Sequence, residues 1–418
     1  MIGPWWRIGW RNLGRNRRRT LIAAAGLALG YFAVVVMVGL MAGLTAEMIE
    51  NGTGLLTGQL QIHALDYRPD RSIYRTIGGD DGTDVARLLR EVITDTAVAG
   101  AAPRVYAGGL VSSGEATTAG ILMGVDPNRE PGVSRILRSV VRGAVPANGQ
   151  SQILIGTEMA RQLDADVGDT VIVVAPAADG SMGNDLFTVS GVFRSGMPEL
   201  DGSYVFVPIG SLQQLIALSP GRVHEIAAST TDPWLAPIAA GRLAAEFSTS
   251  GLTLEVEPWT RLRPEMLDYA RLVEAWDYFV IGIVFAIAVF GVANTMLMAT
   301  FERRREVAVM LALGATPAKI VLSILSEALA LGVISLIAGV AITLPILVWW
   351  HTAPPDLSWL YGDFTMFGAL IRPVLRVEYK PAVAVLTGVA LLLTALIAAL
   401  YPAARAARML PADTLSGI

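Results

Sequence analysis

Four long apolar stretches constrain the fold of this chain more than any other feature of its sequence. Each is long enough to cross a bilayer as an α-helix, which takes roughly 20 residues. The stretches are residues 21–45, 278–300, 320–350 and 382–401. The first two are separated by residues 46–277, whereas the others follow closely. The sequence therefore predicts a four-helix membrane protein with a large domain inserted between helices 1 and 2.

The distribution of charge predicts the orientation of the chain. Residues 1–20, 301–319 and 402–418 together carry twelve basic and three acidic residues, whereas residues 46–277 carry 17 basic and 29 acidic ones. Short segments rich in Lys and Arg stay on the cytoplasmic side of a membrane. Both termini and the 301–319 loop are therefore expected in the cytoplasm, with the large domain and the 351–381 loop outside it.

Several classes of function are excluded. The chain has no cysteine and only three scattered histidines, so no thiolate or histidine-rich metal site is expected. It also lacks the glycine-rich phosphate loop of an ATPase and the nucleophile motif of a hydrolase. We expect no catalytic residue, no metal, no cofactor and no bound nucleic acid in this chain.

The N-terminal 20 residues predict a short basic helix in the inner headgroup layer. Trp6 and Trp10 share one helical face and Arg7 and Arg11 another, which suits contact with anionic lipid. A disordered basic tail is the alternative.

The first span contains two GxxxG spacings, a pattern that lets helix backbones approach closely. Helix–helix packing is expected there, either with a second copy or within one subunit. The glycines are Gly26, Gly30, Gly39 and Gly43.

The inserted domain has an α+β pattern. Period-two stretches predict strands at 58–64, 170–176, 186–193 and 204–208, and helical periodicity predicts helices at 84–96, 158–165 and 232–247. We expect a membrane-proximal part, built from about 46–130 and 222–270, and an inserted part at about 131–221.

The stretch FERRREVAVMLALGAT, residues 301–316, predicts a short amphipathic helix between spans 2 and 3. Val307, Met310, Leu311 and Gly314 recur at helical spacing, and Gly314 can end the helix in a left-handed conformation. Thr316 and Pro317 then suit the start of the next helix. The charges alone are also typical of a simple stop-transfer anchor.

This motif resembles the coupling helix of ABC transporter permeases that work mechanically, a family of macrolide-exporter, cell-division and lipoprotein-releasing types. The resemblance covers nearly the whole chain: one span, a large outer domain, three spans and a basic tail, residues 402–418. It implies a multi-pass protein of the bacterial inner membrane. It also implies a complex with a second permease chain, either a copy or a paralogue, and with a separate ATPase that holds ATP and Mg²⁺.

Carried over residue by residue, the resemblance implies contacts between the 301–316 segment and the ATPase. Polar contacts or membrane-edge anchors would come from Glu302, Arg303, Arg304, Arg305 and Glu306. Apolar side chains filling the ATPase groove would be Val307, Met310, Leu311 and Ala312.

Segments 58–67 and 191–208 look most like lipoprotein-releasing permeases, in which a protruding hairpin recruits a periplasmic carrier. The matching position is residues 175–185, although a plain hairpin turn fits that sequence equally well. Release of lipoproteins or other acylated substrates is therefore the first expectation. The alternatives are efflux of hydrophobic peptides or antibiotics through an adaptor and an outer-membrane channel, and force transmission to a cell-wall hydrolase.

Glu327 is the one charged residue within a predicted span, about 16 Å along the helix from Thr316. A carboxylate at that depth usually has a partner or a function. A protonated or hydrogen-bonded packing role near Ser323 and Ser326 is favoured over a proton or substrate role.

Overall fold

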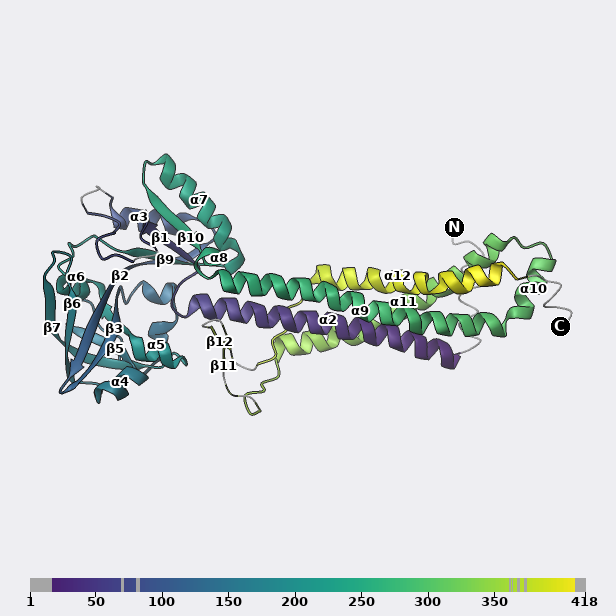
Figure 1. The fold of residues 1–418 in the computed structure, drawn as a ribbon, viewed down its shortest axis with the longest axis horizontal. Coiled ribbons are helices and arrows are strands. Elements are labelled where there is room, and N and C mark those ends of the chain that lie inside the picture. The colour runs from purple at the N-terminus through teal and green to yellow at the C-terminus, as the bar shows by residue number, and fades with distance from the viewer. Residues whose placement is uncertain are drawn as a thin grey trace. The chain divides into compact units, whose positions relative to one another are not determined.

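The computed structural model describes residues 17–68, 71–79, 83–360, 362, 364–366, 369–371 and 374–409. The chain forms two compact units (Figure 1). The membrane unit contains Met1–Thr45, Ala270–Trp359 and Val374–Ile418; the sheet unit contains Ala46–Tyr269 and Leu360–Pro373. The predicted N-terminal helix falls mainly on residues 1–16, outside the described part, while residues 17–20 open the first long helix.

Four helices in the described residues are long and apolar enough to cross a membrane: α2 (Arg17–Gly54), α9 (Pro264–Glu302), α11 (Pro317–Thr352) and α12 (Pro381–Ala407). Each contains one predicted apolar stretch, so the predicted helices and the position of the large domain are confirmed. All four continue beyond the apolar stretches, because helical hydrogen bonding does not stop where hydropathy falls. Their shared core in the membrane unit includes Leu27, Tyr31, Phe285, Leu331 and Leu391.

The sheet unit is built on one ten-stranded sheet in the described residues, ordered β10-β1-β9-β2-β3-β8-β5-β7-β4, with β6 pairing with β2 and β7. Pairs β3–β8 and β5–β7 are parallel and the other pairs are antiparallel. Strand bounds are β1 Leu60–Ala64, β2 Val98–Ser113, β3 Ala116–Val125, β4 Val140–Gly143, β5 Gln152–Gly156, β6 Thr170–Pro176, β7 Met182–Phe193, β8 Tyr204–Pro208, β9 Glu225–Thr230 and β10 Leu254–Pro258.

Short helices pack on this sheet. Their buried faces join the strands in one apolar core, to which α3 contributes Leu88 and Val92 and α7 contributes Leu243 and Phe247. The helices are α3 (Val85–Thr94), α4 (Thr157–Leu163), α5 (Pro198–Ser203), α6 (Ile209–Leu215), α7 (Ala236–Thr249) and α8 (Trp259–Leu262), with 3-10 turns η1 (Glu130–Gly132), η2 (Ile136–Ser139) and η3 (Pro233–Leu235).

The predicted secondary structure of this unit is confirmed at each named strand, which are β1, β6, β7 and β8, and at α3, α4 and α7. The expected division near residues 131 and 221 is not a break in the sheet. Strand β2 is 16 residues long; it pairs with β9 through 98–104 and with β6 through 110–112. One strand thus joins the two predicted parts.

The connection between α11 and α12 is more than a loop. It contains a two-stranded hairpin, β11 (Phe364–Met366) with β12 (Ala369–Ile371), which belongs to the sheet unit. The Asn51 amide nitrogen donates a hydrogen bond to the Leu370 carbonyl oxygen at 2.7 Å, which ties this hairpin to the end of α2.

The turn at the predicted carrier-docking position is compact. Strands β6 and β7 are joined by residues 177–181, and the Ala177 N–H donates to the Ser181 carbonyl oxygen at 2.9 Å. The Asp179 carboxylate accepts from the Ser181 hydroxyl at 2.6 Å. This geometry is that of a plain hairpin turn.

Candidate coupling segment and a buried charge cluster

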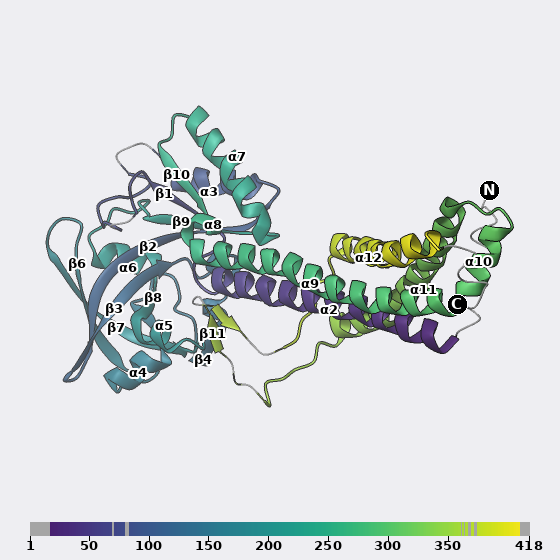
Figure 2. The same ribbon diagram turned by 45° about the vertical axis from the view of Figure 1, so that its right-hand side comes forward.

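The short helix α10 (Arg304–Ala312) lies between α9 and α11 in the membrane unit (Figure 2). It ends in a Schellman motif: Gly314, at φ 90°, donates its N–H to the Leu311 carbonyl oxygen, and Ala315 donates to that of Met310. Thr316 is the N-cap residue of α11, with Pro317 following it. The sequence signals for both helix ends are thus confirmed.

One face of α10 packs inside the chain. Val307 and Ala308 are buried, and Val307 clusters with Ile320 of α11 and Ala406 of α12. Met310 and Leu311 pack partly against the same cluster. In this chain Val307 packs α10 against the membrane helices, so its predicted contact with a partner groove stays a prediction that this packing does not favour.

The other face of α10 is exposed. Val309 and Leu313 are 45% and 83% exposed, and Arg304, Arg305 and Ala312 are also exposed. Of the predicted groove-filling residues, Ala312 alone is fully on this face. The sequence analysis did not name Val309 and Leu313, because an i, i+3, i+4 pattern identifies an apolar stripe but not the side of the helix that stays exposed.

Three of the charged residues predicted to contact an ATPase make ion pairs within the chain. Arg19 of α2 donates two hydrogen bonds to the Glu302 carboxylate, both at 2.7 Å. Arg303, between α9 and α10, contacts Glu306 at 3.2 Å and Glu327 at 3.0 Å. These pairs leave Arg304 and Arg305 as the exposed cations of the segment.

Glu327 has a charged partner that the sequence interpretation did not name. Its side chain is only 13% exposed and accepts a hydrogen bond from Arg303. The nearby Ser326 hydroxyl donates to the Ser323 carbonyl oxygen at 2.8 Å. A poorly exposed ion pair is lost if its segments separate, so the Arg303–Glu327 pair favours this arrangement of α9, α10 and α11.

The four glycines of the two GxxxG spacings in α2 divide into two pairs. A methyl group added at Gly43 would lie 2.1 Å from the Arg376 carbonyl oxygen, and one at Gly39 would lie 2.8 Å from a Val377 side-chain carbon. A methyl group at Gly26 would meet no atom within 4 Å, and one at Gly30 would touch only Val284, at 3.7 Å. Gly39 and Gly43 therefore pack within one subunit, while Gly26 lies on an exposed face.

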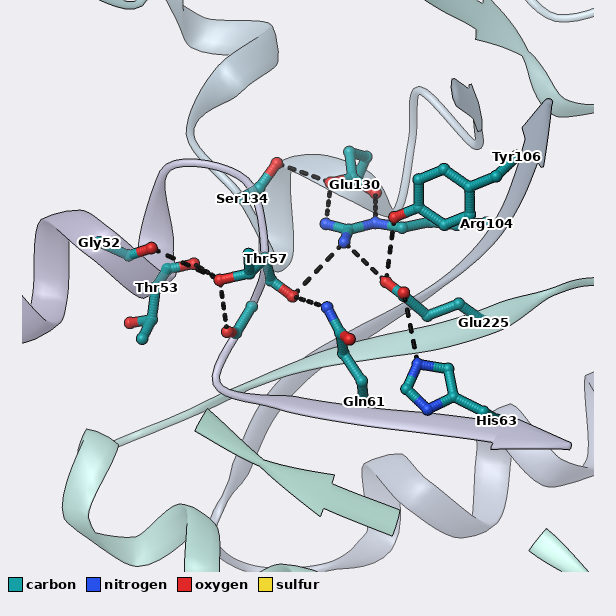
Figure 3. Close-up of polar contacts among 11 residues, drawn as sticks. Gly52, Thr53, Thr57, Gln61, His63, Arg104, Tyr106, Glu130, Ser134 and Glu225 are labelled. Atoms are coloured by element: carbon teal, nitrogen blue, oxygen red, sulfur yellow. Dashed lines mark hydrogen bonds and ion pairs between the residues drawn. The ribbon is translucent and has the colours of Figure 1, made fainter. Parts of the chain in front are cut away.

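A buried charge cluster lies in the sheet unit and was not found from the sequence (Figure 3). Arg104 of β2 binds the Glu130 carboxylate through Nη2 at 2.6 Å and Nε at 3.1 Å, and its Nη1 donates to Glu225 at 2.9 Å. Arg104 and Glu130 are fully buried and Glu225 almost so. The three residues come from segments that are distant in the sequence, so no local pattern pairs them.

Two further groups complete this cluster. His63 Nε2 lies 3.5 Å from Glu225, and the Tyr106 hydroxyl donates to the same carboxylate at 3.2 Å. Although burial opposes ionisation, His63 and Arg104 outweigh it and lower the pKa of Glu225. Within the described ranges, no three acidic or histidine side chains are grouped to hold a metal ion. The cluster can therefore hold a network of charges in place, and it has no exposed nucleophile.

Two family models match the chain. A model described as a MacB-like periplasmic core domain matches residues 20–246, more than half of the chain, and one described as an FtsX-like permease C-terminal domain matches residues 278–411. This chain belongs to the family with a MacB-like periplasmic core domain, and it carries an FtsX-like permease C-terminal domain. The predicted membership among ABC permeases is thereby confirmed.

Curated relatives of this FtsX-like permease align along nearly its full length. The "Lipoprotein-releasing system transmembrane protein LolC" of Xylella fastidiosa is 26% identical over 98% of this chain and 97% of its own length. The protein of the same name in Neisseria meningitidis is 24% identical over 98% of both chains. LolE of Haemophilus influenzae is 23% identical, again over 98% of both. The predicted similarity to lipoprotein-releasing permeases, which are transport proteins and not enzymes, is confirmed.

Among solved structures, the periplasmic region of MacB from Actinobacillus actinomycetemcomitans aligns with 52% of this permease and 95% of its own chain, with 14% identity and a TM-score of 0.37.

Proposed function

We propose that this chain is the permease subunit of an ATP-driven complex that releases lipoproteins, or other acylated substrates, from the outer leaflet of the inner membrane. Its partners are a cytoplasmic ATPase, which binds ATP and Mg²⁺, and a second permease chain. Both termini and α10 lie on the cytoplasmic side, and the sheet unit is periplasmic. Full-length similarity to lipoprotein-releasing permeases supports the substrate class.

The proposed coupling role rests on one observation: one face of α10 is buried in the chain and the other is exposed. Its exposed face presents Val309, Leu313, Arg304 and Arg305, which suits a groove with an apolar floor and acidic rim. A partner that covers Val309 and Leu313 would remove apolar surface from water, which favours binding.

The buried face of α10, together with the adjoining end of α9, would give a push on α10 a path to the other membrane helices. Glu302 at the end of α9 binds Arg19 of α2, Arg303 binds Glu327 of α11, and Val307 packs on Ala406 of α12. The Arg405 guanidinium also lies 4.8 Å from the centre of the Phe301 ring. Because these contacts brace α10 from several helices, it moves with the bundle when the ATPase changes shape.

A matched pair of valines tests this coupling. Val309 on α10 and Val141 on β4 are 45% and 52% exposed, so V309D and V141D introduce the same charge at equally exposed positions. Burial of an aspartate in an apolar groove has an unfavourable free energy, because the carboxylate loses its hydration. We expect V309D to reduce the ATPase activity of the purified complex at least about tenfold, a change of ~1.4 kcal/mol, and V141D to leave it unchanged. Normal activity of folded V309D would contradict the coupling role of α10.

Cargo is tested separately. The complex is purified from its native membrane and its bound molecules are identified by native mass spectrometry. Acylated polypeptide bound with an ATPase supports lipoprotein release, whereas a bound adaptor or channel without acylated cargo contradicts it.

A further inference from the structure

An open cavity of about 370 Å³ lies in the sheet unit, at the segments that join it to two membrane helices. Gly52 and Leu55 come from the end of α2 and the residues after it, and Leu262 and Arg263 immediately precede α9. Chain connectivity therefore keeps this cavity within a few residues of two membrane-crossing helices. No part of α10 or of the proposed ATPase contact belongs to it.

The lining of this cavity is both basic and apolar. Among the residues that the structure describes, three arginines, Arg68, Arg71 and Arg263, line it together with one carboxylate, Glu199. Leucine and methionine side chains supply the apolar part: Leu55, Leu56, Met197, Leu200 and Leu262. A cavity of this composition suits a ligand that has an anionic group and an apolar portion.

Two of the arginines already have a carboxylate partner. Arg68 binds Glu257 at 3.1 Å, and Arg263 binds Glu265 at 2.6 Å. A guanidinium has five N–H donors, so one carboxylate does not exhaust them. Arg68 therefore has donors beyond those that bind Glu257, and Arg263 adds positive charge to the lining.

Arg71 differs from these two. In the part of the chain that the structure describes, its guanidinium has no hydrogen bond and no ion pair. Arg71 is exposed on one side; partial desolvation works against its charge, but the nearby Tyr106 and Glu225 outweigh this and raise the pKa of Arg71. Its backbone has φ 45°, a left-handed conformation that arginine rarely adopts. The cavity is thus lined by a permanently charged group that makes no ion pair with any described residue.

The cavity wall connects to the buried charge cluster. The Thr57 carbonyl oxygen accepts hydrogen bonds from the Gln61 amide at 2.8 Å and from Arg104 at 3.5 Å, and Thr57 and Gln61 both line the cavity (Figure 3). This network holds Thr57 and Gln61 in place, so part of the lining is preorganised before a ligand binds.

We propose that this cavity binds the phosphate group of an anionic amphiphile, with Arg71 as the principal contact and Arg68 and Arg263 as supporting ones. The oxygens of a phosphate point in several directions and accept hydrogen bonds from several guanidinium groups at once. A phosphate therefore suits three arginines around one cavity better than a planar carboxylate does. The adjoining leucines then contact the glycerol and acyl portions of a phospholipid. The shared chemistry, a phosphate, could come from a lipid headgroup or from free phosphate.

The test uses the full chain in neutral detergent, without the ATPase. Binding of short-chain phosphatidylglycerol, short-chain phosphatidylcholine and inorganic phosphate is measured by isothermal titration calorimetry. The variants are R71Q and a matched control, R87Q, in which an arginine of α3 paired with Glu91 outside the cavity is changed in the same way. We expect phosphatidylglycerol to bind the unmodified chain and R87Q equally, and R71Q at least about tenfold more weakly.

The ligand series identifies the source of the phosphate. Binding of phosphatidylglycerol well above that of phosphatidylcholine and inorganic phosphate assigns the site to an anionic headgroup; equal binding of inorganic phosphate, lost in R71Q, assigns it to the free ion. If R71Q fails to fold, R68Q is measured in the same way. Unchanged affinity in the folded variant, or no binding of either phosphate source to the unmodified chain, would overturn the proposal.

Discussion

The tautomer of His224 is set by two backbone groups in the sheet unit. The Tyr106 N–H donates to Nδ1 at 2.9 Å, and Nε2 lies 3.0 Å from the Ile73 carbonyl oxygen. Nε2 therefore carries the proton and Nδ1 accepts. Burial lowers the pKa of His224, although the Ile73 carbonyl acts in the other direction. A second proton on Nδ1 would face the Tyr106 N–H and break that hydrogen bond.

This geometry predicts a pH dependence of stability. The unfolded chain has an ordinary histidine pKa of about 6.5, and the folded pKa is lower. The unfolded state therefore takes up a proton first as pH falls. The stability that His224 contributes is complete above about pH 6.5 and is lost as pH falls toward the folded pKa.

The measurement is the thermal unfolding midpoint of the full chain between about pH 7.5 and pH 5, followed by tryptophan fluorescence, since Trp234 and Trp259 lie in the sheet unit. H224Q should flatten the curve in this range, and the exposed His351, changed to Gln, should not. An unaltered pH dependence in H224Q would show that another group is responsible.

At the scale of elements, the two halves of α2 differ in how closely other segments approach their glycines. Gly43 lies against the backbone of residues 376–378, and the Glu378 N–H donates to the Gly39 carbonyl oxygen at 3.0 Å. Gly26 has open space beside it. The same GxxxG spacing therefore brings backbones together at one end of the helix and leaves an unoccupied face at the other.

Alanine substitutions at Gly43 and Gly26 test this difference in packing. G43A places a methyl group 2.1 Å from the Arg376 carbonyl oxygen, so the helix or the 376–378 segment must shift. Overpacking of this kind typically costs ~1–3 kcal/mol, and a lowered unfolding midpoint in detergent is expected. G26A should leave the midpoint unchanged. Equal midpoints for the two variants would refute the close approach at Gly43.

At the scale of the whole molecule, each unit is assembled from segments far apart in the chain. The membrane unit joins its helices through pairs such as Arg19 and Glu302, and the sheet unit recruits β11 and β12 from the connection between α11 and α12. Asn51 is central to that recruitment: its amide donates to the Leu370 carbonyl oxygen and its oxygen accepts from Arg135, both at 2.7 Å.

Removing the Asn51 side chain should release the β11–β12 hairpin. N51A loses the hydrogen bonds to Leu370 and Arg135, together with a longer one to Glu47 at 3.4 Å, and leaves the Leu370 carbonyl without this partner. We expect the loss to cost about 1–3 kcal/mol locally. Hydrogen exchange of residues 364–366 and 369–371 should then be faster than in the unmodified chain. N128A, at an exposed asparagine in the turn after β3, serves as the control. Unchanged exchange in N51A would mean that other contacts hold the hairpin.

The sequence by itself determined the features that depend on local pattern. Uninterrupted apolar runs located four helices, alternation located β1, β6, β7 and β8, and Gly314 with Thr316 and Pro317 marked the ends of α10 and α11. These follow from periodicity and backbone preference over a few neighbouring residues. The motif at 301–316 also identified the family, because its charges and glycine stand at fixed spacing between two spans.

Only the tertiary structure decided which side chains face each other. In the structure Val307 is buried and Val309 is exposed, and Arg303 pairs with Glu327. Arg104, Glu130 and Glu225 come from three segments and lie in one buried cluster. It also collected Arg68, Arg71 and Arg263 around one cavity. Local periodicity defines the faces of a helix or strand, but the partner of each face depends on contacts between residues that are distant in the chain.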